Sequence, residues 1–415
     1  MSLAWISVAA LVLAVVVSCT TAVNVGVLSM ALAMIVGVLL ADMSPAAVLE
    51  GFPTDLLFTL LGVTLLFAIA ECNGTLERVT ARAVRLCRGQ AGLLPIMFFL
   101  VGFLVATIGA GATPASALLA PPAMAVAGRA RIPPFLMAVM VGNGTLAGTL
   151  SPFAPTGVVA HGVMERIGLD GYEWQTFAYN AAAHALVGFG AFVLFGGWKL
   201  FRSSAGAQGV DASDAPAAVM VRSHWLTVVG ILVFIVAVAG LGADVGMAGI
   251  VIAVALILLR AVDEAAAIRR MPWGVILMVT GVTVLVSMVR ETEGLALITN
   301  AIAAVSTPGT INPIVAFGAG LVSVYSSTSG VVLPAFLPMA PALAEQLGGL
   351  DPLPIAWSMA VSASLVDLSS LSTVGALFIA GAAAGTDVRR LFNALLAWGL
   401  SMAVVGALLC WVLFG

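Results

Sequence analysis

The sequence predicts an all-α polytopic membrane protein built from two inverted repeats, each with five transmembrane helices and one re-entrant hairpin, and with interrupted helices at the membrane midplane. Three observations predict this fold. The 415 residues are 62% hydrophobic and only 8% charged, with a mean hydropathy of +1.17, which is typical of polytopic membrane proteins. Stretches rich in Gly, Pro and Ser break several apolar segments. The order of elements in residues 1–202 recurs in residues 223–415.

The first half opens with three apolar segments, at residues 3–20, 24–41 and 55–70. Each is close to the ~20 residues that a bilayer-spanning helix needs. Residues 76–88 then place four arginines, Arg78, Arg82, Arg85 and Arg88, on one helical face. This spacing predicts a helix that lies on the membrane surface.

Two interrupted elements and a last helix complete the first half. Residues 93–127 are apolar except for a break at residues 109–116, which favours a re-entrant hairpin, because bent backbone at membrane depth survives only inside protein or along a cavity. Residues 133–167 contain two prolines and two glycines between positions 148 and 157, so we predict a helix that unwinds in its middle. Residues 176–200 form the closing helix.

The second half repeats this order after residues 203–222, whose Ser, Gly, Ala, Asp and Pro predict a flexible cytoplasmic linker. Three helices are expected at residues 225–241, 246–259 and 273–289, and residues 281–285, GVTVL, repeat GVTLL at 62–66. A short amphipathic segment at 295–304 precedes a broken hairpin at 311–347. An interrupted helix at 353–384, with its break at 369–375, and a helix at 391–414 follow.

Charged residues predict the topology. If the four arginines between Arg78 and Arg88 are cytoplasmic, the crossings also place most other basic residues inside, and only Arg166 and Arg290 fall outside. Five crossings per half invert the second half relative to the first, so both termini are predicted to lie outside. The two hairpins then enter from opposite sides, and their tips meet near the midplane. We expect an integral protein of a bacterial inner membrane.

Inverted repeats with broken helices are typical of secondary transporters, whose sites lie between the repeats. Each break frees backbone N–H and carbonyl groups that bind ions. The hydroxyl run Ser326 to Ser329, inside an apolar region, adds oxygen ligands. These groups could bind a small anion without a buried arginine.

A net charge of −3 excludes a basic surface for nucleic acid. The expected partners are a small anion, the lipid bilayer and a second copy of the chain in a homodimer.

Three stretches, GFPTDLL at residues 51–57, GVTLLFAIA at 62–70 and NGT at 73–75, resemble the N-terminal domain of the MatC family of dicarboxylate (malonate) carriers. This family belongs to the ion transporter superfamily, which includes the divalent anion/sodium symporters. The resemblance implies secondary active transport of a small dicarboxylate by alternating access, coupled to a cation or a proton. Related symporters place a Ser-Asn-Thr motif at each hairpin tip. Gly111-Ala112-Thr113 and Ser326-Ser327-Thr328 take these places without the asparagine. The resemblance therefore supports an anionic substrate better than it supports sodium as the coupling ion.

The candidate residues follow from the breaks and from this resemblance. The expected substrate-binding residues are Thr113, Pro114, Ser116, Asn143, Thr156, Ser326, Ser327, Thr328, Ser329, Ser372 and Thr373. The expected coupling-ion residues are Asp367, Ala112, Thr149, Ser151, Ser369 and Ser370, and His161 is a candidate proton carrier. No metal site and no cofactor are expected, apart from Na⁺ or H⁺ as the coupling ion.

Each candidate also has a structural interpretation. Asp367 either takes part in coupling, as ionisable groups at membrane depth often do, or caps a helix end. His161 can be a packed residue, and the glycines around Asn143 also suit close helix packing. The serines Ser369, Ser370 and Ser372 can bond back to their own helix. His184 and His224 are expected to anchor helix ends at the membrane interface.

Other functions remain open at this point. The chain could transport another ion, such as citrate, gluconate or an exchanged cation. A membrane-embedded enzyme is a more remote alternative, because Ser151 and His161 are the only nucleophile–base pair near in sequence and lack a third orienting group.

Overall fold

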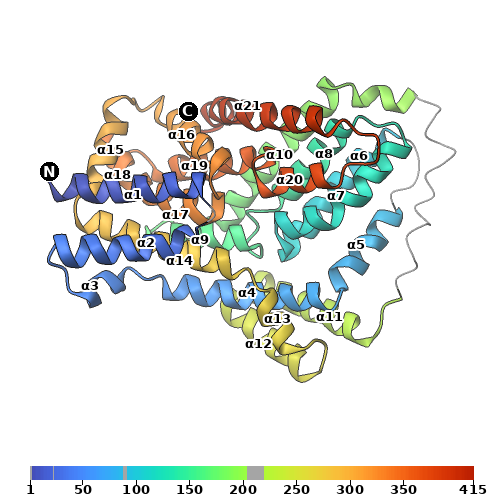
Figure 1. Cartoon of the computed structure of the whole chain (residues 1–415), viewed down its shortest axis with the longest axis horizontal. Coiled ribbons are helices and arrows are strands. Elements are labelled where there is room, and N and C mark those ends of the chain that lie inside the picture. Colours follow the sequence, from blue (N-terminus) through green and yellow to red (C-terminus); the bar gives the residue numbers. More distant parts are fainter. Residues whose placement is uncertain (1, 22, 87–90, 203–218) are drawn as a thin grey trace.

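The computed structural model describes residues 2–21, 23–86, 91–202 and 219–415, and these residues form helices without β-strands (Figure 1). The predicted linker falls almost entirely outside the described residues, as do Arg88 and the last residues of the predicted surface helix. The all-α fold class is confirmed. Each half contains the predicted elements in the predicted order.

The first half begins with helices close to their predicted bounds. They are α1 (Leu3–Thr20), α2 (Val25–Met34, continued by a π-helical turn at Ile35–Leu40), the short α3 (Pro45–Glu50), α4 (Thr54–Cys72) and α5 (Thr75–Leu86). The side chain of Asn24 accepts the backbone N–H of Gly26 at 3.0 Å and so caps α2.

The first hairpin consists of α6 (Leu93–Val105, continued to Ala110 as a π-helix) and α7 (Ala112–Arg129). Gly109 and Gly111 turn the chain with φ angles of 120° and 77°, which residues with a Cβ rarely adopt. The predicted break at residues 109–116 is therefore too long. Thr113, Pro114 and Ser116 belong to the first turns of α7, where a proline is tolerated because the N–H that it lacks would have no acceptor within the helix.

An interrupted helix and a long helix follow. The chain runs from α8 (Pro134–Ala147) through non-helical residues 148–154 into α9 (Pro155–Arg166) and then α10 (Glu173–Leu194), with a 3₁₀ segment at Gly197–Arg202. Pro155 occupies the first position of α9, which suits its fixed φ angle.

The second half has equivalent elements. They are α11 (Arg222–Ile235, continued to Gly240), α12 (Val245–Leu258), α13 (Glu264–Arg270), α14 (Trp273–Glu291), α15 (Gly294–Ala304), α16 (Ile311–Tyr325), a π-helical segment (Thr328–Val332), α17 (Leu333–Phe336), a 3₁₀ turn (Leu337–Met339), α18 (Ala340–Gln346), α19 (Pro352–Leu365), a 3₁₀ turn (Val366–Leu368), α20 (Thr373–Ala380) and α21 (Val388–Phe414).

Glycines at equivalent positions join the two halves reciprocally. A Cβ on Gly281 of α14 would lie 2.0 Å from the carbonyl oxygen of Gly26 of α2. A Cβ on Gly62 of α4 would lie 2.2 Å from the carbonyl oxygen of Gly246 of α12. Only glycine permits this approach of helix backbones. Because α2 packs on α14 as α12 packs on α4, the halves pair as a two-fold relation requires. Their inversion across the membrane stays a prediction.

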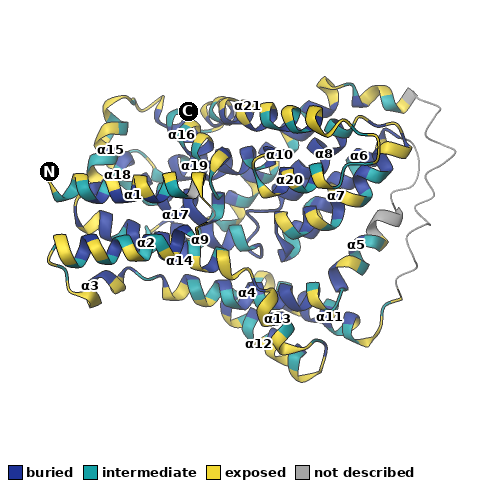
Figure 2. Cartoon of the chain, in the orientation of Figure 1, coloured by how far each residue is buried: buried dark blue, intermediate teal, exposed yellow. Residues whose placement is uncertain are grey.

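Long apolar helices and their exposed side chains suit a bilayer. Among the described residues, seven helices are long and apolar enough to cross a membrane: Thr54–Cys72, Leu93–Ala110, Glu173–Leu194, Arg222–Gly240, Trp273–Glu291, Pro352–Ala380 and Val388–Phe414. Large apolar side chains are exposed on outer helices, as in Leu194 and Val412, whereas α8 and α19 are buried almost throughout (Figure 2). The apolar surface indicates contact with lipid.

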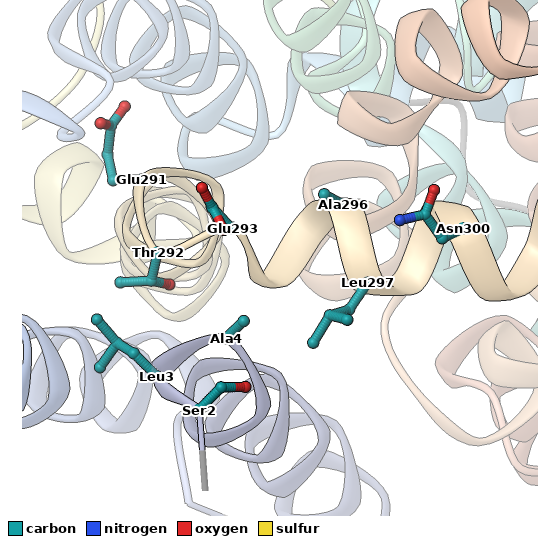
Figure 3. Close-up of a pocket in the computed structure, with 9 residues that line it drawn as sticks. All are labelled: Ser2, Leu3, Ala4, Glu291, Thr292, Glu293, Ala296, Leu297 and Asn300. Carbon is teal, nitrogen blue, oxygen red and sulfur yellow. The ribbon is translucent and has the colours of Figure 1, made fainter.

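Contacts between the ends of helices show which loops lie at the same end of the helix bundle. The start of α1 and the end of α14 line a cavity of about 450 Å³, where Ser2, Leu3 and Ala4 lie beside Thr292 and Glu293 (Figure 3). At the other end, Arg270 forms an ion pair with Glu71. The topology prediction places the two members of each pair on the same side of the membrane, and the structure brings them together.

Candidate functional site

The two hairpins and the two interrupted helices meet at a cavity of about 520 Å³, here called the central cavity. Its lining combines hydroxyls, helix starts and one carboxylate. The lining residues are Thr21, Val23, Asn24, Val25, Ala110, Gly111, Ala112, Thr113, Pro114, Thr149, Pro155, Thr156, Pro272, Val275, Met278, Tyr325, Ser326, Ser327, Thr328, Ser329, Asp367, Leu371, Ser372, Thr373 and Val374.

The first half contributes two helix N-termini without side-chain caps. Gly111 precedes α7 and Ala154 precedes α9, and neither makes a capping hydrogen bond from its side chain. The first N–H groups of a helix have no acceptor within the helix. Thr113, which is exposed, and Thr156 bring hydroxyls to the same two helix starts. This part of the cavity therefore offers hydrogen-bond donors and the positive ends of two helix dipoles.

The second half contributes helix starts that are already capped. Ser327 accepts the N–H of Gly330 at 3.0 Å, and Ser372 accepts the N–H of Gly375 at 3.1 Å. The hydroxyl of Ser372 also bonds to backbone carbonyls within the break, including that of Ser369 at 2.8 Å. These serines therefore shape the backbone of the site and leave fewer free donors than the first half does.

Asp367 is the only charged side chain among the described residues that line the central cavity. Its carboxylate accepts a hydrogen bond of 2.6 Å from Thr328, which stands at the tip of the second hairpin. Ser323 of α16 contacts the Thr328 hydroxyl and donates to the carbonyl of Ala363 at 3.0 Å. A carboxylate with neighbouring hydroxyl and carbonyl oxygens is a ligand set that suits a proton or a hard cation.

The two breaks align residue by residue. A Cβ on Gly157 would lie 1.9 Å from the carbonyl oxygen of Ser151, and a Cβ on Gly375 would lie 2.0 Å from that of Ser369. The spacing between glycine and serine is the same in both halves. Thr149 of the first half therefore occupies the place that Asp367 occupies in the second, so the site has one carboxylate rather than two.

Several predicted residues lie outside the lining of the cavity. Ser116 bonds to Thr145 at 2.8 Å, and Ser151 donates to the carbonyl of Thr107 at 2.7 Å. Ser369 accepts the N–H of Leu371 at 3.3 Å, and Ser370 is buried. The hydroxyls of Ser116, Ser151 and Ser369 therefore support the backbone behind the cavity, whereas that of Ser370 has no hydrogen-bond partner among the described residues.

The histidines differ in their surroundings. His161 lies on α9 away from the cavity lining, and its buried Nε2 has no hydrogen-bond partner among the described residues. The expectation that His184 anchors a membrane interface is wrong. His184 is fully buried and bridges the two interrupted helices, with Nδ1 3.0 Å from Asn143 Oδ1 and Nε2 3.0 Å from Ser364 Oγ. Asn143 thus serves this bridge rather than the cavity.

His224 lies at the start of α11 and joins elements there, and its anchoring at a membrane interface stays a prediction. Its Nδ1 accepts the N–H of Val221 at 2.9 Å, so its Nε2 donates to the carbonyl of Asn73, also at 2.9 Å. Because these bonds tie α11 to the turn after α4, they connect the two halves.

Residues between α1 and α2 were not identified from the sequence as part of the site. Thr21 and Asn24 line the central cavity, and Asn24 also donates to the carbonyl of Gly274 at 2.9 Å. Tyr325, at the end of α16, lines it as well. A polar pair between two apolar segments was the available signal, but a turn between helices shows the same pattern.

Comparisons with known proteins agree with this architecture. Residues 1–149 match the family model of the N-terminus of the dicarboxylate carrier protein MatC, which confirms the resemblance over that part of the chain. No curated protein matches the chain. The structure is similar to the YdaH transporter of Alcanivorax borkumensis, whose crystal structure has an unusual topology, with a TM-score of 0.60 and 16% identity over 97% of this chain and 98% of that one. At this identity the likeness shows the fold. Together the comparisons support a membrane transporter.

Proposed function

We propose that the chain is a secondary active transporter that carries a small dicarboxylate, the size of malonate or a C4-dicarboxylate, across a bacterial inner membrane together with a cation or a proton. One observation carries this proposal. Two uncapped helix N-termini, those of α7 and α9, converge on a cavity that also contains the carboxylate of Asp367.

The uncapped helix starts supply the anion-binding part of the site. A helix N-terminus behaves as roughly half a positive charge, and its free N–H groups point toward a bound anion. A substrate carboxylate at this place is within reach of the Thr113 and Thr156 hydroxyls. This arrangement explains how a site can hold a carboxylate when its described lining residues include no arginine, lysine or histidine.

Charge balance supports coupling to a cation or a proton. A dicarboxylate brings two negative charges to a cavity in which Asp367 is the one charged side chain among the described lining residues. Uncompensated charge at membrane depth costs several kcal/mol. A cation or proton bound at Asp367, with Thr328 and Ser323 beside it, offsets part of this charge, and substrate binding then favours ion binding.

An asymmetry between equivalent residues supports alternating access. Phe153 lies within the first break and is buried, with its ring 5.7 Å from Phe234. Leu371, at the equivalent place within the second break, is 50% exposed and lines the central cavity. The starts of α2 and α14 line the cavity through Asn24, Val25, Val275 and Met278, and both starts are predicted to lie on the cytoplasmic side. We infer that this is an inward-open state. In the outward-open state the surroundings of Phe153 and Leu371 would be exchanged, and the cavity would open to the outside of the membrane.

Equilibrium binding tests the substrate class. Malonate and succinate are titrated into the purified protein in detergent by calorimetry, with acetate as the control that has one carboxylate. We expect saturable binding of a dicarboxylate, with acetate about tenfold weaker or more. Equal binding of acetate would contradict a dicarboxylate site.

A cation transporter is the second candidate, because the one charged side chain among the described lining residues is negative. It would be favoured by the absence of dicarboxylate binding together with cation flux that requires Asp367. Those two measurements separate the candidates, since the first proposal requires dicarboxylate binding.

A further inference from the structure

A second cavity, of about 1040 Å³, lies apart from the central cavity and shares none of its lining residues. We call it the loop cavity, because loops from both halves form it. Its walls are the connection between α7 and α8, the residue after α10, and the connection between α20 and α21 with the first turns of α21. Its size is at the top of the range of about 300–1,000 Å³ that is usual for small-molecule sites.

Two arginines at the loop cavity supply positive charge. Arg131 lies in the α7–α8 connection and Arg390 in the first turn of α21, and both are exposed. Within the described part of the chain, neither guanidinium has a hydrogen bond or an ion pair. Asp387 also lines the cavity, but its carboxylate accepts the backbone N–H of Arg390 at 2.9 Å and caps α21. The lining therefore has a net positive charge.

Aromatic rings form the opposite, apolar wall. The ring of Phe135 lies 5.0 Å from that of Phe195 and 6.0 Å from that of Trp398, with both pairs edge to face. Phe195 is 49% exposed, although it sits among apolar neighbours. Ala394 and Ala397 of α21 leave room beside these rings. An occupant that matches this wall must have a hydrocarbon part.

The position in the fold selects the kind of amphiphile. The spanning helix α21 begins at the cavity, so the cavity lies at the end of a membrane-spanning segment. The charge pattern predicts that both connections lie on the cytoplasmic side, and the structure brings them to one cavity. Basic pockets between helices on that side suit lipid headgroups of negative charge. A soluble anion would use the arginines but leave the aromatic wall exposed.

We propose that the loop cavity binds an anionic phospholipid, with its phosphate against Arg131 and Arg390 and an acyl chain along Phe135, Phe195 and Trp398. The lipid would fill the space between the α7–α8 and α20–α21 connections. The helices α7 and α20 carry Thr113 and Thr373 of the central cavity at their other ends, so the lipid would contact both helices that bear the site.

Native mass spectrometry of the delipidated protein tests this assignment, with phosphatidylglycerol, phosphatidylcholine and inorganic phosphate added separately. We expect phosphatidylglycerol to bind at least about tenfold more tightly than phosphatidylcholine, and inorganic phosphate not to compete with it. The double variant Arg131→Gln/Arg390→Gln should lose this preference. Arg269→Gln, at an exposed arginine outside the cavity, is the matched control and should keep it.

A second variant tests the apolar wall without touching the charges. Ala397→Trp fills the space beside Trp398, so it should block phosphatidylglycerol while the arginines remain. Equal binding of both phospholipids by the unmodified protein would overturn the proposal. Competition by inorganic phosphate would overturn it as well, because the cavity would then be a site for soluble anions. Unchanged phosphatidylglycerol binding in both the arginine and the Ala397→Trp variants would place the lipid elsewhere.

Discussion

The hydroxyl of Thr328 donates a hydrogen bond of 2.6 Å to the carboxylate of Asp367. This bond joins the tip of the second hairpin to the break in the second interrupted helix. The first half has no such pair, because Thr149 stands where Asp367 would be. The structure thus separates a carboxylate-bearing half from a half with uncapped helix starts. In our account, the first of these binds the coupling ion and the second binds the substrate anion.

Replacement of Asp367 by Asn should uncouple transport. The amide can still accept the hydrogen bond from Thr328, so the fold is expected to persist, but it carries no charge and takes up no proton. We expect uptake to fall about tenfold or more and to lose its response to an ion gradient. Asp351→Asn is the matched control, since Asp351 caps the start of α19, the helix that ends just before Asp367, and lies outside the cavity lining. Gradient-driven uptake by Asp367→Asn at the normal rate would exclude this residue as the coupling site.

Thr113→Ala and Thr328→Ala should each abolish uptake at normal membrane expression. The first removes a hydroxyl at an uncapped helix start, and the second removes a bond to a partly buried carboxylate, which is worth about 1.5–3 kcal/mol. Thr283→Ala is the control, because that hydroxyl bonds to its own helix at the carbonyl of Val279. Uptake is measured in membrane vesicles with radiolabelled malonate. Full activity in both variants would remove the hairpin tips from the site.

Cysteine labelling tests the inward-open state. In a background that lacks the four native cysteines, Leu371→Cys should react with a membrane-impermeant maleimide from the cytoplasmic side. Phe153→Cys should react far more slowly, because that residue is 4% exposed. A bound dicarboxylate should slow the reaction at position 371. Equal labelling at both positions would contradict one-sided access.

Gly281→Ala should destabilise the protein, because its Cβ would lie 2.0 Å from the Gly26 carbonyl oxygen and force α2 and α14 apart. Overpacking of this kind costs about 1–3 kcal/mol. Gly190→Ala is the control, since a Cβ there meets nothing within 4 Å, and alanine favours the helix by about 0.5–1 kcal/mol. The thermal unfolding midpoint in detergent measures both. A midpoint unchanged by Gly281→Ala would show that the close approach is not needed.

The positions of the elements and the hairpin tips were predictable from sequence for a clear reason. A hydroxyl run such as Ser326 to Ser329, or a break such as Ser369 to Gly375, is easily recognised because the neighbouring sequence contains few other polar residues. Both stretches reach the central cavity or its supporting backbone. Their chemistry is local, so it can be read along the chain.

Residues that act through distant partners were not predictable in this way. His184 can be buried because both ring nitrogens have hydrogen-bond partners, Asn143 and Ser364, which lie on two different helices. Neither partner is near His184 in sequence. Asn24 reaches the cavity only because α2 packs against α14. The loop cavity likewise needs connections from both halves. Sequence periodicity gives the face of a helix but not what the other half places against it.

Uptake into proteoliposomes tests the central claim most directly. A panel of labelled malonate, succinate, citrate and acetate is offered under an imposed sodium gradient, an imposed pH gradient or neither. We predict concentrative uptake of a dicarboxylate under one of the two gradients, lost in Thr113→Ala and uncoupled in Asp367→Asn. No uptake of any dicarboxylate under either gradient, by protein that is correctly folded and inserted, would contradict it.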